Sequence, residues 1–297
     1  MDNVVVVKTT VPIPTRVLVF GMCHENGTVL ADELFVVAQA CGHTVEQVRS
    51  CLRRLVAEGL FVRSGTGRHA SYRATEEGMA ALGKTMERTR LAYGQDAAGR
   101  GWDGHWRLVG FAVPEGRRSA RDALRDRLVS LGGASVQAGL YVSPHPWHKE
   151  ARAAAERLGL SDHIVCATTD DLEVAGQRDP RELAKLLWNV EELEERYRSF
   201  TERFSFVPAF LEEMRQRGER LQDEAFLPGA LSMAVAFQEC FEADPLLPPE
   251  LLPRPWPGTE ARDLVMQSRR LALAMRATRG RPMLFRFFDE AVEVLPA

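Results

Sequence analysis

The segment between Thr44 and Thr75 constrains the fold more than any other part of this sequence. Thr44 and Gln47 fit the S/T-x-x-E/Q pattern of a capping box, in which side chains bind the amide groups left free at a helix start. Gly59 suits the other end of the helix, because glycine tolerates the left-handed conformation common there. The segment therefore predicts one helix that begins after Thr44 and ends before Gly59, followed by short strand-like runs.

Apolar residues recur along this helix at i, i+3, i+7 and i+10, which is the spacing of one buried stripe: Val45, Val48, Leu52 and Leu55. We expect the stripe to pack on two earlier helices, which the apolar spacing predicts within residues 15–24 and 30–42. At about 100° per residue, the polar residues point away from it. These outward residues are Glu46, Gln47, Ser50, Arg53 and Arg54, with Arg49 at the flank of the stripe.

The runs "LFVRS" and "ASYRAT" alternate in polarity and are separated by "GTGRH", which predicts a β-hairpin with a glycine-rich tip. Gly65, Gly67 and Ala70 also satisfy the degenerate dinucleotide pattern G-x-G-x-x-[GA]. A dinucleotide site needs a helix directly after the glycines, however, and here a strand-like run follows. Three helices followed by a hairpin instead indicate a winged helix-turn-helix, in which the third helix enters the DNA major groove.

The charge distribution agrees with a DNA-binding surface. The whole chain has a formal net charge of -3, but residues 44–75 contain six arginines and two glutamates, a local balance of +4. The candidate DNA-binding residues are Gln47, Arg49, Ser50, Arg53, Arg54, Arg68, His69 and Tyr72. The alternative at this point is a winged-helix fold used only for protein contacts, with the arginines as a solvated face.

The rest of the chain predicts two further domains. Strand-like and helical runs alternate from Trp106, which suits a ferredoxin-like sandwich, and the chain is helical after Pro180 except for a proline-rich, apolar strap. The expected fold class is α+β, with an N-terminal winged helix-turn-helix, a central ferredoxin-like α/β sandwich and a C-terminal helical domain. The expected boundaries are 1–93, a linker at 94–104, 105–178, and 179–297 with the strap at 243–258.

The sequence contains no pattern typical of a disulfide framework, a metal site or a catalytic site. The five cysteines include no C-x-x-C pair, so we predict neither disulfides nor a zinc ribbon. His145 and His148 are three apart, but no third metal ligand is marked nearby. No nucleophile-elbow, zincin or P-loop pattern occurs, so we predict no catalytic residue, no cofactor and no metal. Without a secretion signal or an apolar span, we expect a cytoplasmic protein.

Three ordered motifs resemble the PaaX family of transcriptional regulators over roughly residues 15–290. The first is "VRSCLRRLVAEGLFVRSGTGRHASYRAT", which matches the family's helix and G-R-x-x-x-Y wing. The second is "WRLVGFAVPEGRRSARDALRDRLVSLGGASVQAGLYVSP", and the third is the strap "ADPLLPPELLPRPWPG". The recognition helix carries its own polar set, so no operator sequence can be transferred from a relative.

The resemblance implies a homodimeric repressor that binds double-stranded operator DNA and responds to a small-molecule effector. The best-known relatives are released from DNA by phenylacetyl-coenzyme A, so a coenzyme A thioester is the expected ligand class. Candidate effector-binding residues are Trp106, Arg107, Arg118 and Trp147. Arginines at 117, 118, 121 and 125 offer cations for its phosphates, although interleaved Asp122 and Asp126 favour a solvated face.

The resemblance also relates the middle domain to a small CRISPR-associated nuclease fold, which needs an acidic metal ligand after its first strand. Here that position contains residues 111–114, "FAVP", so we expect no nuclease activity. Two alternatives from other classes remain open. One is an enzyme that acts on an acyl-coenzyme A or a nucleotide, and the other is an interaction scaffold without DNA affinity.

Overall fold

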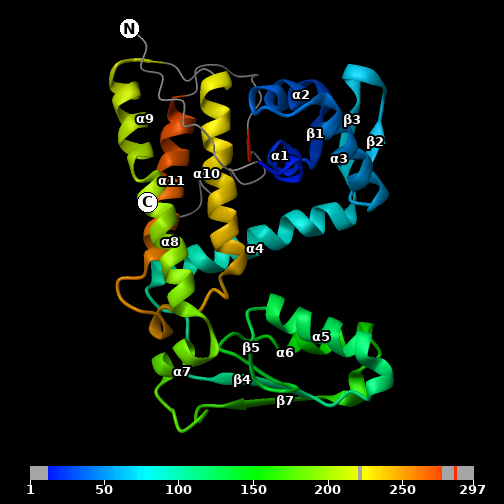
Figure 1. The fold of residues 1–297 in the computed structure, drawn as a ribbon, viewed down its shortest axis with the longest axis vertical. Coiled ribbons are helices and arrows are strands. Elements are labelled where there is room, and N and C mark those ends of the chain that lie inside the picture. The colour runs from blue at the N-terminus through cyan, green and yellow to red at the C-terminus, as the bar shows by residue number, and fades with distance from the viewer. Residues whose placement is uncertain (1–12, 220–222, 276–283, 286–297) are drawn as a thin grey trace. The chain divides into compact units, whose positions relative to one another are not determined.

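The computed structural model describes residues 13–219, 223–275 and 284–285 (Figure 1). Contacts between residues divide the chain into two compact units. The first contains the described residues of Met1–Tyr93, Ser199–Glu239 and Glu260–Ala297, and the second contains Gly94–Arg198 and Cys240–Thr259. Residues of the predicted C-terminal segment 179–297 therefore belong to both units. Helix predicted for residues 276–283 and 286–297 lies outside the described residues.

The first unit begins with the expected helices and hairpin. Its elements are α1 (Thr15–Gly21), β1 (Thr28–Leu30), α2 (Ala31–Ala40), α3 (Val45–Ala57), β2 (Phe61–Ser64), a 3₁₀ turn (Gly67–His69), β3 (Ser71–Ala74) and α4 (Glu76–Ala98). The capping box is confirmed, because the Gln47 amide donates to Thr44 Oγ1 and the Thr44 amide donates to Gln47 Oε1. Gly59 has φ +74°, as its place after α3 predicts.

Strand β1 was missed by the sequence patterns. It is only three residues long and leads directly into α2, so it offers no alternating pattern. The sheet has the order β1-β3-β2 with antiparallel pairs, and Val29 faces Tyr72 across the first of them. Strand β3 is therefore central, and this position explains the burial of Tyr72, whose exposed fraction is 8%.

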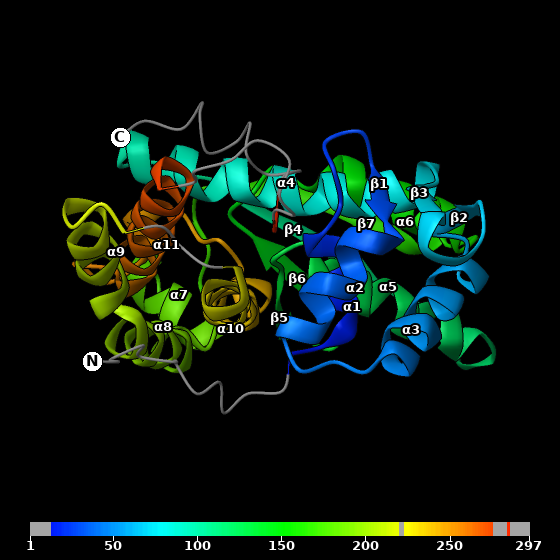
Figure 2. The ribbon, with the colours of Figure 1, turned by 90° about the horizontal axis from the view of Figure 1, so that it is seen from above.

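One hydrophobic core joins α1, α2, α3 and the sheet, and α10 (Asp223–Ala243) contributes Leu227, Leu231 and Val235 to it. The predicted stripe of α3 is corrected at one position. Val48, Leu52 and Leu55 are buried, but Val45 is 49% exposed. In both views α3 lies on the side of this core away from α10 (Figure 2). The polar residues of α3 are exposed.

The expected linker at 94–104 is partly helical. Helix α4 starts after Thr75, whose Oγ1 accepts from the Gly78 amide at 3.1 Å, and it continues to Ala98. The remaining residues are also fixed within the second unit, since Glu250 accepts hydrogen bonds from the amides of Gly101 and Trp102. The segment therefore consists of the last turn of α4 and a loop that is hydrogen-bonded to Glu250.

The second unit contains a four-stranded sheet. Its elements are β4 (Trp106–Phe111), α5 (Arg118–Ser130), β5 (Ala134–Gln137), β6 (Leu140–Ser143), α6 (His148–Arg157), β7 (Ile164–Thr169) and α7 (Pro180–Leu187). The strands have the order β5-β6-β4-β7, every pair is antiparallel, and α5 and α6 cover one face (Figure 1). Strands β5 and β6 form a hairpin, because Gly139 turns the chain between them at φ +76°.

The remaining helices are α8 (Val190–Phe204), α9 (Phe206–Gln216), α10 and α11 (Pro257–Ala274). The strap between α10 and α11 packs as an apolar segment, with Leu246, Leu247, Leu251, Leu252 and Trp256 all buried. Asp244 fixes its start by accepting from the Tyr197 hydroxyl at 2.8 Å and from the Leu246 amide at 2.7 Å. Within the described residues, no helix combines the length and the apolar character that crossing a membrane requires.

Candidate functional site

The outward face of α3 is polar and accessible. Val48, Cys51, Leu52 and Leu55 are buried, whereas the six polar residues of the predicted outward set are all exposed: Glu46, Gln47, Arg49, Ser50, Arg53 and Arg54. The helix period therefore separates the two sets as expected. A face of this kind presents guanidinium, amide and hydroxyl groups along the whole length of one helix.

These polar residues do not all have the same freedom. Gln47 uses its side-chain oxygen in the capping box, at 2.7 Å from the Thr44 amide, so it helps to fix the start of α3. Arg49 lies 3.8 Å from Glu46 and 6.0 Å from the centre of the Phe35 ring. Arg53 forms no ion pair within the described part of the chain, and its side chain is exposed. Arg53 is therefore available to a partner on this helix.

The hairpin tip depends on glycine. Gly65 has φ +75°, and a Cβ at this residue would lie 2.9 Å from the backbone oxygen of His69. His69 itself is exposed, while the side chain of Arg68 lies outside the described residues. The tip can therefore bring exposed backbone and His69 toward a polyanion, in line with the interpretation of these glycines as a wing tip.

The structure changes the predicted interface at three positions. Tyr72 is buried in the core, so we leave it out of the interface. Arg63 on β2 and Arg73 on β3 are exposed and add two cations to the predicted interface. Both belong to the basic segment of the sequence, and the folded hairpin leaves both residues exposed.

The candidate effector residues are engaged in structural contacts. The ring of Trp106 is 1% exposed and stacks on Trp188 at 6.2 Å between centroids. Trp147 is 3% exposed and donates from Nε1 to the Arg107 backbone oxygen at 3.2 Å. Arg118 is exposed and its ion pair is local, 3.8 Å from Asp122. The structure thus brings Trp147 and Arg107 together, and the assignment of these residues to an effector stays a prediction.

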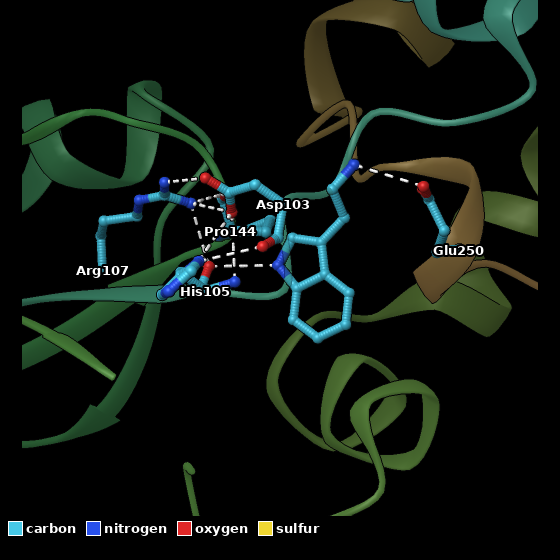
Figure 3. Close-up of polar contacts among 6 residues, drawn as sticks. Asp103, His105, Arg107, Pro144 and Glu250 are labelled. Carbon is cyan, nitrogen blue, oxygen red and sulfur yellow. Dashed lines mark hydrogen bonds and ion pairs between the residues drawn. The ribbon is translucent and has the colours of Figure 1, made fainter. Parts of the chain in front are cut away.

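Arg107 has the densest polar contacts in this part of the second unit (Figure 3). Its guanidinium forms an ion pair with Asp103, and its Nη1 also donates to the backbone oxygens of His105 and Pro144 at 3.0 and 2.8 Å. The arginine hydrogen bond lowers the pKa of Asp103 from 3.8 to about 2. This pair anchors the segment that precedes β4 to the segment that follows β6.

The Asp103 pair predicts an acid-sensitive contribution to stability. Because the pKa of Asp103 is lower in the folded chain, the unfolded chain binds the proton more tightly, so this contribution is complete above about pH 5 and is lost as the pH falls toward 2. We expect Asp103→Asn to lower the free energy of unfolding of the second unit by roughly 0.5 to 1 kcal/mol at neutral pH, because Arg107 loses its charged acceptor but solvent screens the half-exposed carboxylate.

Urea unfolding followed by tryptophan fluorescence measures this effect, since all five tryptophans lie in the second unit. The difference between wild type and Asp103→Asn should shrink as the pH is lowered through 4. If the two proteins differ by the same free energy of unfolding over the whole acid range, the ion pair of Asp103 with Arg107 is not the source of the difference.

The arginines at the start of α5 already have partners. Arg117 donates to the backbone oxygens of Gly159 and Leu158 at 2.8 and 3.1 Å. Arg121 pairs with Glu115 at 2.9 Å, and Arg125 pairs with Asp126 at 3.0 Å. These contacts support the interpretation of this helix surface as a solvated face rather than a phosphate-binding cluster.

The two histidines of "HPWH" do not form part of a metal centre in the described residues, where no group of three or more metal-ligating side chains comes together. His148 lies 3.2 Å from the Leu108 backbone oxygen through Nε2, and burial lowers the pKa of its imidazole. His148 therefore connects the start of α6 to β4 through this contact.

Comparison with known families now defines the class. Three family models match consecutive parts of the chain: PaaX-like protein over residues 17–78, the PaaX protein central Cas2-like domain over 99–184, and the PaaX-like protein C-terminal domain over 188–279. The chain thus contains three successive parts: an N-terminal helical module with a small sheet, a Cas2-like α/β domain and a C-terminal helical domain. The chain belongs to the PaaX-like family.

Two individual proteins illustrate the relationship. The transcriptional repressor PaaX of Escherichia coli strain K12 is 25% identical over 246 residues, which cover 82% of this chain and 74% of the relative. An uncharacterized protein of Mycobacterium tuberculosis has a similar solved structure, with a TM-score of 0.52 and 24% identity over 82% of this chain and 87% of that one. The first is a distant homologue, and the second supports the fold alone.

Proposed function

We propose that this protein is a DNA-binding transcriptional repressor whose N-terminal segment, residues 1–93, acts as a winged helix-turn-helix. In this proposal α3 is the recognition helix and the β2–β3 hairpin is the wing. The observation that carries the proposal is the exposed basic face of α3, where Arg49, Arg53 and Arg54 are exposed while Val48, Leu52 and Leu55 are buried in the core. The homologue named as a transcriptional repressor supports the same function.

The proposal also covers the fold of the middle domain and the assembly of the protein. The order β-α-β-β-α-β with strands arranged β5-β6-β4-β7 supports a ferredoxin-like sandwich in residues 105–178. We infer that the protein is a homodimer, as the resemblance to PaaX regulators implies. Two copies would then place two recognition helices on a dyad-symmetric operator, with half-sites separated by one or more helical turns of roughly 34 Å.

A small-molecule effector completes the proposal. We infer that an aromatic acyl-coenzyme A, or a related metabolite, releases the repressor from its operator, as the resemblance to PaaX regulators implies. The protein would then bind DNA and the ligand without chemical turnover and act in the cytoplasm. An enzyme acting on the same thioesters would instead hydrolyse or transfer the acyl group, and product analysis after incubation separates the two cases.

Binding measured against salt concentration tests the DNA-binding function. We expect the full-length protein to bind the duplex upstream of its own coding sequence with Kd between about 10⁻⁸ and 10⁻¹¹ M at physiological salt. Affinity for random duplex should fall steeply as salt is raised, because it depends on counterion release from phosphates. Equal affinity for the two duplexes at every salt concentration would count against a repressor.

A further inference from the structure

Phe35 lies on α2, the helix that precedes α3 and packs against it. Its side chain is partly buried and packs on the hydrophobic core that α1, α2, α3 and the sheet share. The guanidinium carbon of Arg49 on α3 lies 6.0 Å from the centre of the Phe35 ring, within the range of a cation–π contact. The core therefore fixes the ring, and the ring restricts where the guanidinium of Arg49 lies.

Arg49 stays accessible despite this contact. Its side chain is 59% exposed, and it also lies 3.8 Å from the carboxylate of Glu46, whose side chain is 75% exposed. An ion pair this exposed is weak and is screened by salt, so it holds the guanidinium loosely. Phe35 is the more rigid neighbour, because it packs on the core. Arg49 is therefore oriented mainly by a residue of the preceding helix.

The position of Arg49 around α3 indicates which part of DNA it would contact. At about 100° per residue, Arg49 lies about 40° from Arg53 around the helix axis, and its contact with Phe35 places it on the flank toward α2. In a helix-turn-helix, the helix before the recognition helix crosses the DNA backbone. The flank of α3 toward α2 is therefore the flank that would meet a phosphate.

Resting on the proposed function, we infer that Phe35 is a positioning residue that holds the Arg49 guanidinium ready for a DNA phosphate in each half-site. An arginine whose side chain is already restricted loses less conformational entropy on binding, so the ring strengthens a contact that it does not make itself. Phosphate contacts carry no sequence information. Phe35 therefore contributes to the affinity for operator and for random duplex alike.

Phe35→Leu tests this role, because it removes the ring and keeps an apolar side chain on the core. We expect the full-length protein to bind both duplexes about two- to fivefold more weakly per half-site, the range for one exposed cation–π contact, or about 5- to 30-fold for two half-sites. Phe35→Tyr keeps the ring and should bind within about twofold of wild type.

The dependence of Kd on salt concentration reports the phosphate contact itself. Arg49→Ala should reduce the slope of log Kd against log salt by about 1 per half-site, because a phosphate contact is lost. Phe35→Leu should leave this slope unchanged, since the cation is still present.

A double-variant cycle distinguishes positioning from a merely structural role. In the Arg49→Ala background, Phe35→Leu should change either affinity by less than about twofold, because the residue through which it acts is gone. Phe20→Leu is the matched control, since Phe20 is also partly buried against this core and its ring centre lies 5.4 Å from the guanidinium of Arg16. Any loss from Phe20→Leu should be the same with and without Arg49.

The outcomes separate this inference from the proposed function. Phe35 does not position Arg49 if Phe35→Leu leaves both affinities unchanged, or weakens binding equally in the Arg49→Ala background. The same holds if Phe35→Tyr weakens binding as much as Phe35→Leu. In each of these cases specific binding by wild type still supports the repressor function. Wild-type protein without affinity for either duplex at low salt would overturn both.

Discussion

Replacing Arg53 by alanine is expected to weaken operator binding by about 1 to 3 kcal/mol, or roughly 5- to 150-fold in Kd, while changing affinity for random duplex much less. Arg53 points outward from α3 and has no ion-pair partner among the described residues, so its guanidinium is available for bidentate contact with a guanine. The loss should therefore depend on sequence. Titration of labelled operator and labelled random duplex with each protein measures both affinities.

Arg152→Ala is the matched control for this prediction. Arg152 is also an exposed arginine on a helix, α6, but it lies in the second unit. We expect its replacement to leave operator affinity within about twofold of wild type, because an isolated surface charge contributes little. If Arg53→Ala lowers the affinity for operator and random DNA equally, Arg53 contacts phosphate and is not a base-reading residue.

Gly78→Ala is expected to destabilise the first unit by about 2 to 4 kcal/mol. A Cβ at residue 78 would lie 2.1 Å from the Leu60 backbone oxygen, where helix α4 approaches the chain between α3 and β2. That oxygen accepts a hydrogen bond from the Thr75 amide at 3.0 Å. The added methyl therefore forces the start of α4 away from the hairpin and breaks the contact that fixes it.

Gly83→Ala provides the opposite result in the same helix. No atom lies within 4 Å of a Cβ at residue 83, so alanine adds helix propensity without a clash and should stabilise by about 0.5 to 1 kcal/mol. Urea unfolding followed by far-ultraviolet circular dichroism reports both variants, and tryptophan fluorescence reports the second unit alone. Two shifts of the same sign would contradict this account of the α4 start.

Local sequence rules predicted the parts of the fold that depend on neighbours along the chain. The Thr44 capping box, the end of α3 at Gly59 and the polar face of α3 all follow from residues within four positions of one another. The resemblance to the PaaX family, made on three ordered motifs, is confirmed by three family models.

The features that sequence patterns missed depend on distant contacts. Strand β1 exists because it pairs with β3, some forty residues later, and this pairing buries Tyr72. Val45 fits the apolar spacing of α3 but projects beyond the end of the core, so periodicity could not place it. The sequence could not decide whether Trp106 and Trp147 lie in a core or in a ligand pocket, since a tryptophan has the same sequence pattern in both places.

Footprinting of the upstream DNA by the full-length protein tests whether the protein is an effector-responsive DNA-binding repressor. Nuclease cleavage is mapped with and without the protein, and again in the presence of aromatic acyl-coenzyme A compounds. We expect two protected half-sites related by a dyad, with centres about 34 Å or a multiple of it apart, and protection that one of the thioesters removes. Cleavage that is unchanged by the protein, or protection that random duplex abolishes at equal concentration, would contradict it.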